Sequence, residues 1–153
     1  MGHPPLTSIR MIAELARFAG MEREVTGTAE ALALHLFGEP PTAEALVAER
    51  GNAVIGYALF YTTFSTFRGR AGLYLEDLYV VEAERGAGVG KALLRGVARV
   101  ARARDAARLE WLVLDWNTRA LDFYVASGAT LLGDRRTCRI SERELEQLGA
   151  GES

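Results

Sequence analysis

The sequence predicts an α/β fold with a mixed, mostly antiparallel central sheet and helices on both faces of that sheet. Three observations lead to this class. Apolar residues recur at helical spacing from Leu6 to Phe18. Two apolar runs flank a tight turn at Gly51-Asn52, which predicts an antiparallel hairpin. A further run, Leu73 to Val81, leads through a glycine-rich turn into an amphipathic helix.

Composition limits the function classes. The chain has 153 residues, 49% hydrophobic and 25% charged, so residues 1–153 are expected to form one domain. A net charge of −2 disfavours nucleic acid and anionic membranes as partners. Cys138 is the only cysteine, which excludes an internal disulfide and fits a reducing cytoplasm. His3 and His35 lie far apart, so no metal site is expected, and no apolar run is long enough to span a membrane.

The elements follow in order. The first helix, Leu6 to Phe18, is preceded by Pro4-Pro5, which disfavour a strand before it. A second helix is predicted from Thr28 to Phe37, because Gly38 and Pro40-Pro41 end it. The hairpin strands are Ala43 to Glu49 and Ala53 to Phe64, and a turn at residues 67–70 leads to the strand Leu73 to Val81.

In the second half of the chain, predicted helices and strands again alternate. Spacing predicts a helix from Val89 to about Arg104, followed by a buried strand from Leu109 to Trp116. Asn117 is a good N-cap for a helix from Thr118 to Ser127, which Gly128 ends. A last strand is predicted from Thr137 to Ile140, and Ser141 with Glu144 forms a capping box that opens a terminal helix.

The turn from Arg85 to Lys91 is the strongest chemical signal. Glycines at 86, 88 and 90 let successive N–H groups face one concavity at a helix N-terminus, which suits a phosphate. Arg85 stands where a Walker A loop needs glycine, and Ala92 replaces its metal-binding hydroxyl. The glycine spacing also departs from a dinucleotide fingerprint. The bland alternative is a tight strand-to-helix connection without a ligand.

Arg85, Gly88 and Gly90 form R-x-x-G-x-G, which resembles the acetyl-coenzyme A turn of the GNAT N-acetyltransferase superfamily. The resemblance runs from about Ile9 to the C-terminus. Within the superfamily, the chain is similar to the diamine acetyltransferase branch, which includes spermidine/spermine and thialysine enzymes. The further matching segments are Tyr74–Val80, Leu114–Asn117, Asp122–Tyr124 and Gly128-Ala129.

This resemblance implies acetyl-CoA as co-substrate, no metal, a homodimer, and a sheet opened between the Leu73–Val81 and Leu109–Trp116 strands. Acetyl transfer would proceed by direct attack of an amine within a ternary complex. The residues implied in binding the coenzyme are Leu78, Tyr79, Val80, Arg85, Gly86, Ala87, Gly88, Val89, Gly90, Lys91, Asn117 and Tyr124. Asn117 is equally explained as a simple N-cap, and Lys91 as a solvent-facing residue.

The resemblance also implies the catalytic pair. Tyr124 matches the tyrosine that protonates the departing thiolate, and Glu76 matches a carboxylate that helps deprotonate the amine. Because an ammonium titrates near ~10 and a carboxylate near ~4, partial burial of Glu76 is required. Asp77 would point to the opposite face of a regular strand unless a bulge redirects it, and is assigned a supporting position.

The acceptor is expected to be a diamine, polyamine or thialysine-like amine. The substrate-binding set is Glu76, Asp77, Asp115, Glu22 and Trp116. Ala19 and Gly20 replace acidic and aromatic residues common in the family, which leaves an unrelated amine, such as an amino acid or antibiotic, as an alternative. A non-catalytic coenzyme-binding module is another alternative.

Relatives usually carry a β-strand before the first helix, which this sequence does not predict. Three explanations are open: the strand is absent, the neighbouring edge is covered by another subunit, or the chain begins late.

Overall fold

The computed structural model describes residues 28–39 and 41–151. The chain divides into two units, one ending at Leu112 and the other beginning at Val113, and each is described by itself. The predicted first helix, Leu6 to Phe18, lies outside the described residues, as does Glu22. The predictions for these parts therefore stay predictions, as does the single domain.

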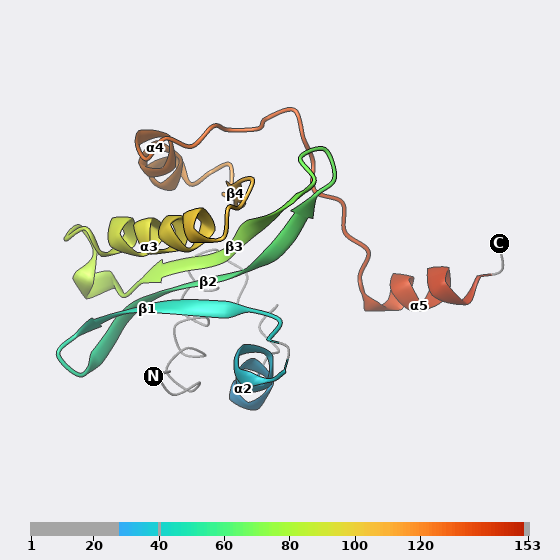
Figure 1. The fold of residues 1–153 in the computed structure, drawn as a ribbon, viewed down its shortest axis with the longest axis horizontal. Coiled ribbons are helices and arrows are strands. Elements are labelled where there is room, and N and C mark those ends of the chain that lie inside the picture. The colour runs from blue at the N-terminus through green and yellow to red at the C-terminus, as the bar shows by residue number, and fades with distance from the viewer. Residues whose placement is uncertain (1–27, 40, 152–153) are drawn as a thin grey trace. The chain divides into compact units, whose positions relative to one another are not determined.

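The first unit contains a four-stranded sheet in the order β1-β2-β3-β4 (Figure 1). The strands are β1 (Glu44–Arg50), β2 (Ala53–Ser65), β3 (Arg70–Val80) and β4 (Leu109–Glu110). The β1–β2 and β2–β3 pairs are antiparallel, whereas β3 and β4 are parallel. The mixed, mostly antiparallel sheet is confirmed.

The predicted hairpin is confirmed with its turn. Gly51 has φ 61°, in the left-handed region that a tight hairpin turn requires. Gly69 plays the same part between β2 and β3, with φ 63°. β3 begins at Arg70, three residues before the predicted Leu73, because the antiparallel ladder continues to the Ser65–Arg70 pair.

Helix α3 (Val89–Ala103) packs along one face of this sheet and contacts β1, β2 and β3 (Figure 1). Its buried residues are Leu93, Leu94, Val97 and Ala101. A Cβ at Gly56 would lie 2.7 Å from the Tyr79 carbonyl oxygen and 3.2 Å from Leu93 Cδ1, so only glycine permits this approach. The predicted helix is therefore confirmed within one residue of its expected end.

Two further elements complete this unit. Helix α2 (Ala29–Phe37) begins one residue after the predicted Thr28, because Thr28 is its N-cap: its Oγ1 accepts a hydrogen bond from the Ala31 N–H at 3.1 Å. A single 3-10 turn, η2 (Glu82–Glu84), connects β3 to the glycine turn. Within residues 28–39 and 41–151, no helix combines the length and apolar character needed to cross a bilayer.

The prediction of a buried strand from Leu109 to Trp116 is wrong beyond Glu110. β4 pairs only with Leu73 and Tyr74 of β3, and Leu112 is already exposed. The bulge that follows in β3 accounts for this, because an extra residue bends the strand and breaks the register that a parallel neighbour needs. The stretch of β3 from Leu75 onward therefore has no β4 partner among the described residues.

The second unit contains α4 (Thr118–Ala126) and α5 (Glu142–Ala150). Both helices were predicted, and Asn117 caps α4 as expected. The predicted strand from Thr137 to Ile140 is wrong, because this stretch is exposed and has no ladder partner among the described residues. The capping box is also wrong in detail, since Ser141 occupies the N-cap position without a side-chain hydrogen bond.

Candidate active site

The glycine turn between β3 and α3 has the backbone that the sequence predicted. Gly86 has φ 85° and Gly88 has φ 87°, a region that residues with a Cβ rarely adopt. A Cβ at either position would meet no atom within 4 Å, so the glycines are needed for conformation and leave open space beside the backbone. Gly90, inside α3, does not have a positive φ and instead lies near Val80 Cγ2.

This turn presents positive potential. Gly88 is the N-cap of α3 and offers no capping side chain, so the first N–H groups of α3 are left for an external acceptor. No acidic residue lies in the first turn of α3, where Lys91 is exposed. The helix dipole and these N–H groups favour an anion. The residues present therefore fit the pyrophosphate of a coenzyme.

Arg85 ties the turn to the end of β3. Its Nε donates to the Val80 carbonyl oxygen at 2.9 Å, and its guanidinium lies 5.4 Å from the centre of the Tyr79 ring. The Val80 carbonyl oxygen thus accepts a hydrogen bond from a side chain of the same protein. The Tyr79 side chain is buried, so this residue can meet a coenzyme only through its backbone. Ala87 is exposed at the tip of the turn.

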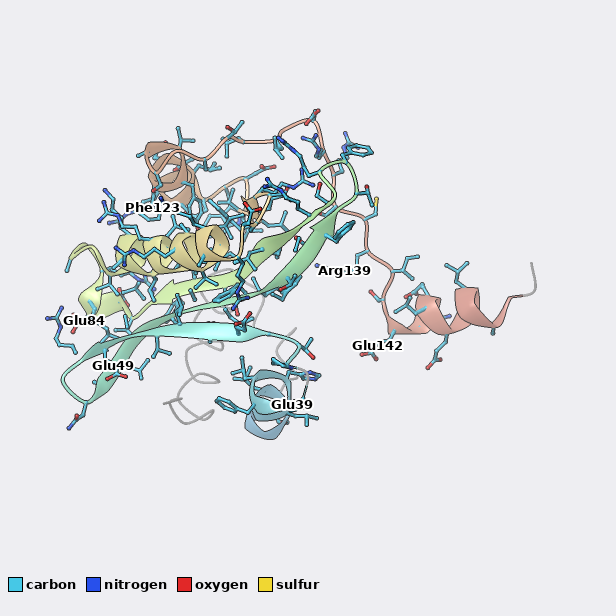
Figure 2. The ribbon with its side chains drawn as sticks, in the orientation of Figure 1. Glu39, Glu49, Glu84, Phe123, Arg139 and Glu142 are labelled. Carbon is cyan, nitrogen blue, oxygen red and sulfur yellow. The ribbon has the colours of Figure 1, made fainter. Side chains whose placement is uncertain are left out.

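A second contact supports the turn from the β1–β2 hairpin, whose turn lies at the same end of the sheet as the end of β3. Arg50, the last residue of β1, donates through Nε to Glu84 Oε2 at 2.9 Å. Glu84 is the last residue of η2, immediately before Arg85, and Figure 2 labels it at the bend that leads to α3. The hairpin and the glycine turn are thereby linked through side chains.

A bulge in β3 places two neighbouring carboxylates on one face. Leu59 pairs with Asp77 whereas Phe60 pairs with Leu75, so Glu76 is the extra residue of β3. Because of this extra residue, Asp77 lies on the side of Tyr57 and Tyr79 rather than on the α3 side with Leu75. The Tyr57 hydroxyl donates to Asp77 Oδ2 at 3.2 Å. The sequence prediction allowed such a bulge, and the structure shows it.

Of the two carboxylates, Asp77 is partly buried and Glu76 is exposed. Burial and the neighbouring Glu76 charge together raise the pKa of Asp77 to about 6, and the hydrogen bond from Tyr57 opposes this rise. Glu76 is exposed, so the partial burial that was required of it as a base is absent. The expected partial burial of Glu76 is therefore wrong, because the bulge leaves Glu76 exposed and directs Asp77 towards Tyr57.

Tyr57 is the residue that sequence reasoning missed. Its side chain is buried, and its ring packs against Tyr79 with centroids 6.3 Å apart. Burial, followed by the charge of Asp77, raises the pKa of Tyr57 well above its ordinary value. The hydroxyl therefore stays protonated and continues to donate. In the sequence Tyr57 is one of many apolar strand residues, and only the register after the bulge links it to Asp77.

The second unit holds the other predicted residues. Tyr124 lies on α4 beside Phe123, which Figure 2 labels, with ring centroids 5.3 Å apart. Burial raises the pKa of Tyr124, so its phenol is protonated at neutral pH. Asn117 Oδ1 accepts from the Ala120 N–H at 3.2 Å, which shows that its capping role is real. Asp115 and Trp116 are exposed in the turn before this helix.

The predicted residues thus fall into two groups. Glu76, Asp77 and the turn from Arg85 to Lys91 are connected through β3 in the first unit. Asp115, Trp116, Asn117 and Tyr124 belong to the second unit. Among the described residues, no group of three or more His, Cys, Asp or Glu side chains could hold a metal ion.

Comparison with known proteins follows this geometry. Residues 9–129 match the family model described as "Acetyltransferase (GNAT) family". Thialysine N-epsilon-acetyltransferase of Bos taurus is 42% identical over 129 residues, covering 79% of this chain and 75% of the relative. L-ornithine N5-acetyltransferase of Arabidopsis thaliana is 35% identical over 112 residues, covering 72% of this chain and 49% of the relative. The solved structure of an integron cassette protein from V. cholerae has a TM-score of 0.78 at 25% identity, covering 95% and 91% of the two chains.

Proposed function

The chain belongs to the GNAT family of acetyltransferases, and from this premise we propose that it acetylates the distal primary amine of a short diamine or of a thialysine-like amino acid. The supporting observation is the pair of adjacent carboxylates, Glu76 and Asp77, on one face of the strand that leads into the glycine turn. Two carboxylates attract a cationic amine, and the partly buried one does so where water competes less.

The relatives narrow the acceptor. Thialysine and ornithine, the substrates named for two of them, are both amino acids with a second amine at the end of a short chain. A substrate of that shape carries its reacting ammonium group away from its α-carboxylate. The anionic end then stays distant from Glu76 and Asp77, which would repel it.

We propose that the coenzyme binds at the glycine turn of the first unit. The N–H groups at Gly88 and Val89 and the positive end of α3 would hold its pyrophosphate, with Lys91 beside them. Arg85 would support the turn through Val80 rather than bind phosphate by its Nε. Backbone groups of Leu78 and Tyr79, together with Asn117, are proposed to hold the remainder of the coenzyme. Acetyl-CoA supplies the acetyl group as a thioester.

The residues then divide the proton transfers. Glu76 and Asp77 bind the ammonium, and one of these carboxylates takes up the proton that it loses, so that the nitrogen lone pair forms a bond to the acetyl carbon. The carbon–sulfur bond breaks, and the Tyr124 hydroxyl gives its proton to the thiolate. The second proton that leaves the attacking nitrogen restores the phenol. Because the pKa of Tyr124 is raised, the phenol holds that proton until it is needed. Asp115 and Trp116 are proposed to line the acceptor side, with Glu22.

Steady-state kinetics test this function. Initial rates with acetyl-CoA and thialysine varied together should give intersecting double-reciprocal lines, which indicate that both substrates bind before any product leaves. Parallel lines would indicate a covalent acetyl-enzyme and would contradict direct attack. Mass spectrometry of the product should place one acetyl group on the distal amine. Absence of acetylated product with every diamine and diamino acid would overturn the acceptor assignment.

We further propose a homodimer in the cytoplasm. Phe64 and Phe67, at and beyond the end of β2, are 66% and 99% exposed, and exposed apolar surface of this kind can serve as a protein interface. Sedimentation at micromolar concentration should give twice the chain mass, and a monomer at all concentrations would contradict the dimer. The lone Cys138 agrees with a reducing compartment.

A further inference from the structure

None of the residue roles proposed above uses the hydrogen bond between Tyr57 and Asp77. Tyr57 is buried on the face of the sheet opposite α3, and its hydroxyl donates to Asp77 Oδ2 at 3.2 Å. In a regular strand Asp77 would lie on the other face, so this contact exists only because Glu76 is inserted as a bulge. The bulge and the hydroxyl together determine where the Asp77 carboxylate lies.

We propose that Tyr57 is a positioning residue for acetyl transfer, whose hydroxyl holds the Asp77 carboxylate, in its charged form, beside Glu76 for the acceptor ammonium. This inference rests on the proposed function. Two adjacent carboxylates repel each other, and one of them tends to take up a proton instead of binding an amine. A buried hydroxyl that can only donate to the charged carboxylate counters that tendency.

The surroundings of Asp77 leave few other groups for this task. The described ionisable groups around this face are four tyrosines, two glutamates and one cation: Tyr57, Tyr61, Tyr74, Tyr79, Glu76, Glu110 and Arg85. The Arg85 guanidinium lies 5.4 Å from the centre of the Tyr79 ring, and its Nε donates to the Val80 carbonyl oxygen rather than to Asp77. β1 contributes the apolar Val47 to the cluster around Tyr57 and Tyr79. Among the described residues, Tyr57 provides the one recorded hydrogen bond to the Asp77 carboxylate. Its removal should therefore act directly on the charge of Asp77.

The direction of the expected pH shift follows from the effect of this hydrogen bond on the pKa of Asp77. The bond lowers the pKa of Asp77, which burial and Glu76 have raised to about 6. Without the hydroxyl, Asp77 takes up its proton at higher pH, and the acid limb of kcat/KM for the amine moves upward. A hydrogen bond to a charged group corresponds to a shift of about one pH unit. At pH 6 the loss would be about fivefold, and at pH 8.5 it would nearly vanish.

The decisive experiment compares pH profiles of full-length variants. Tyr57→Phe keeps the ring and removes the hydroxyl, and it should shift the acid limb upward by about one pH unit with activity recovered at pH 8.5. Tyr61→Phe is the matched control, because it removes a hydroxyl from the same strand and face without a recorded bond to Asp77. Its acid limb should coincide with that of the wild type.

A second variant separates positioning from packing. In an Asp77→Asn background, Tyr57→Phe should cause no further shift, because the group that the hydroxyl acts on has been removed. An equal loss for Tyr57→Phe at every pH, or a shift that persists in the Asp77→Asn background, would overturn the proposal. An unshifted limb in an active Tyr57→Phe enzyme would do so as well. A wild type that turns over no amine would instead refute the proposed function, so the two failures are distinguishable.

Discussion

Asp77 shows how one inserted residue changes the chemistry of a strand. Its pKa of about 6 exceeds the ordinary value of 3.8, because burial and Glu76 both disfavour its charge. The folded state therefore binds a proton more readily than the unfolded chain does. Folding stability from this group is present below about pH 4 and is lost as pH rises towards 6 and above. The site thus keeps a charge that the fold alone would not favour.

Asp77→Asn should therefore stabilise the protein while it impairs the enzyme. At pH 7.5 the free energy of unfolding should rise by on the order of 2 kcal/mol, because the buried charge is removed and Oδ can still accept from Tyr57. At pH 3.5 the variant and the wild type should be nearly equally stable. Urea unfolding at both pH values checks this. A variant that is less stable than the wild type at pH 7.5 would contradict the assigned cause of the pKa shift.

Tyr124 gives the sharpest test of the proton donor. Tyr124→Phe keeps the ring that contacts Phe123 and removes only the hydroxyl. If the phenol protonates the thiolate, kcat should fall about 100-fold or more while the Kd of acetyl-CoA stays the same. Stopped-flow thiol release and calorimetry measure the two quantities. A kcat equal to that of the wild type would remove Tyr124 from the mechanism.

At the scale of elements, we propose that the glycine turn and α3 together form an anion-binding site. Gly88→Ala forces a Cβ onto a backbone with φ 87° and should weaken acetyl-CoA binding by about tenfold, at a conformational cost of about 1 kcal/mol. Gly69→Ala is the matched control, since φ is 63° and the site is the β2–β3 turn. It should lose similar stability with unchanged acetyl-CoA affinity. Equal affinity in both variants would argue against a coenzyme at this turn.

The predictability of the elements depended on whether local patterns were sufficient. Turn glycines and helical spacing predicted the hairpin and α3 correctly, because these features are encoded by adjacent residues. The length of β4 and the strand at Thr137 to Ile140 were predicted wrongly, because a strand needs a partner that composition does not reveal. The pairing of Tyr57 with Asp77 depended on a register shift, which only the folded sheet shows.

At the scale of the molecule, the proposal places a particular acceptor site on a common fold. The solved structure cited above shares the architecture at 25% identity. In this chain the two carboxylates lie on β3 and the tyrosine that contacts Asp77 lies on β2. The central claim is that these carboxylates receive a small primary amine that is then acetylated. If this claim failed, the protein would be a coenzyme-binding module without this activity.

Thiol release from acetyl-CoA, measured across a panel of amines, tests that claim most directly. The panel is thialysine, ornithine, lysine, putrescine, spermidine and an aminoglycoside. We expect saturable turnover with the highest kcat/KM for an amine at the end of a short chain, and much lower values for the aminoglycoside. If no amine raises thiol release above that of acetyl-CoA alone while the protein still binds acetyl-CoA, the claim is contradicted.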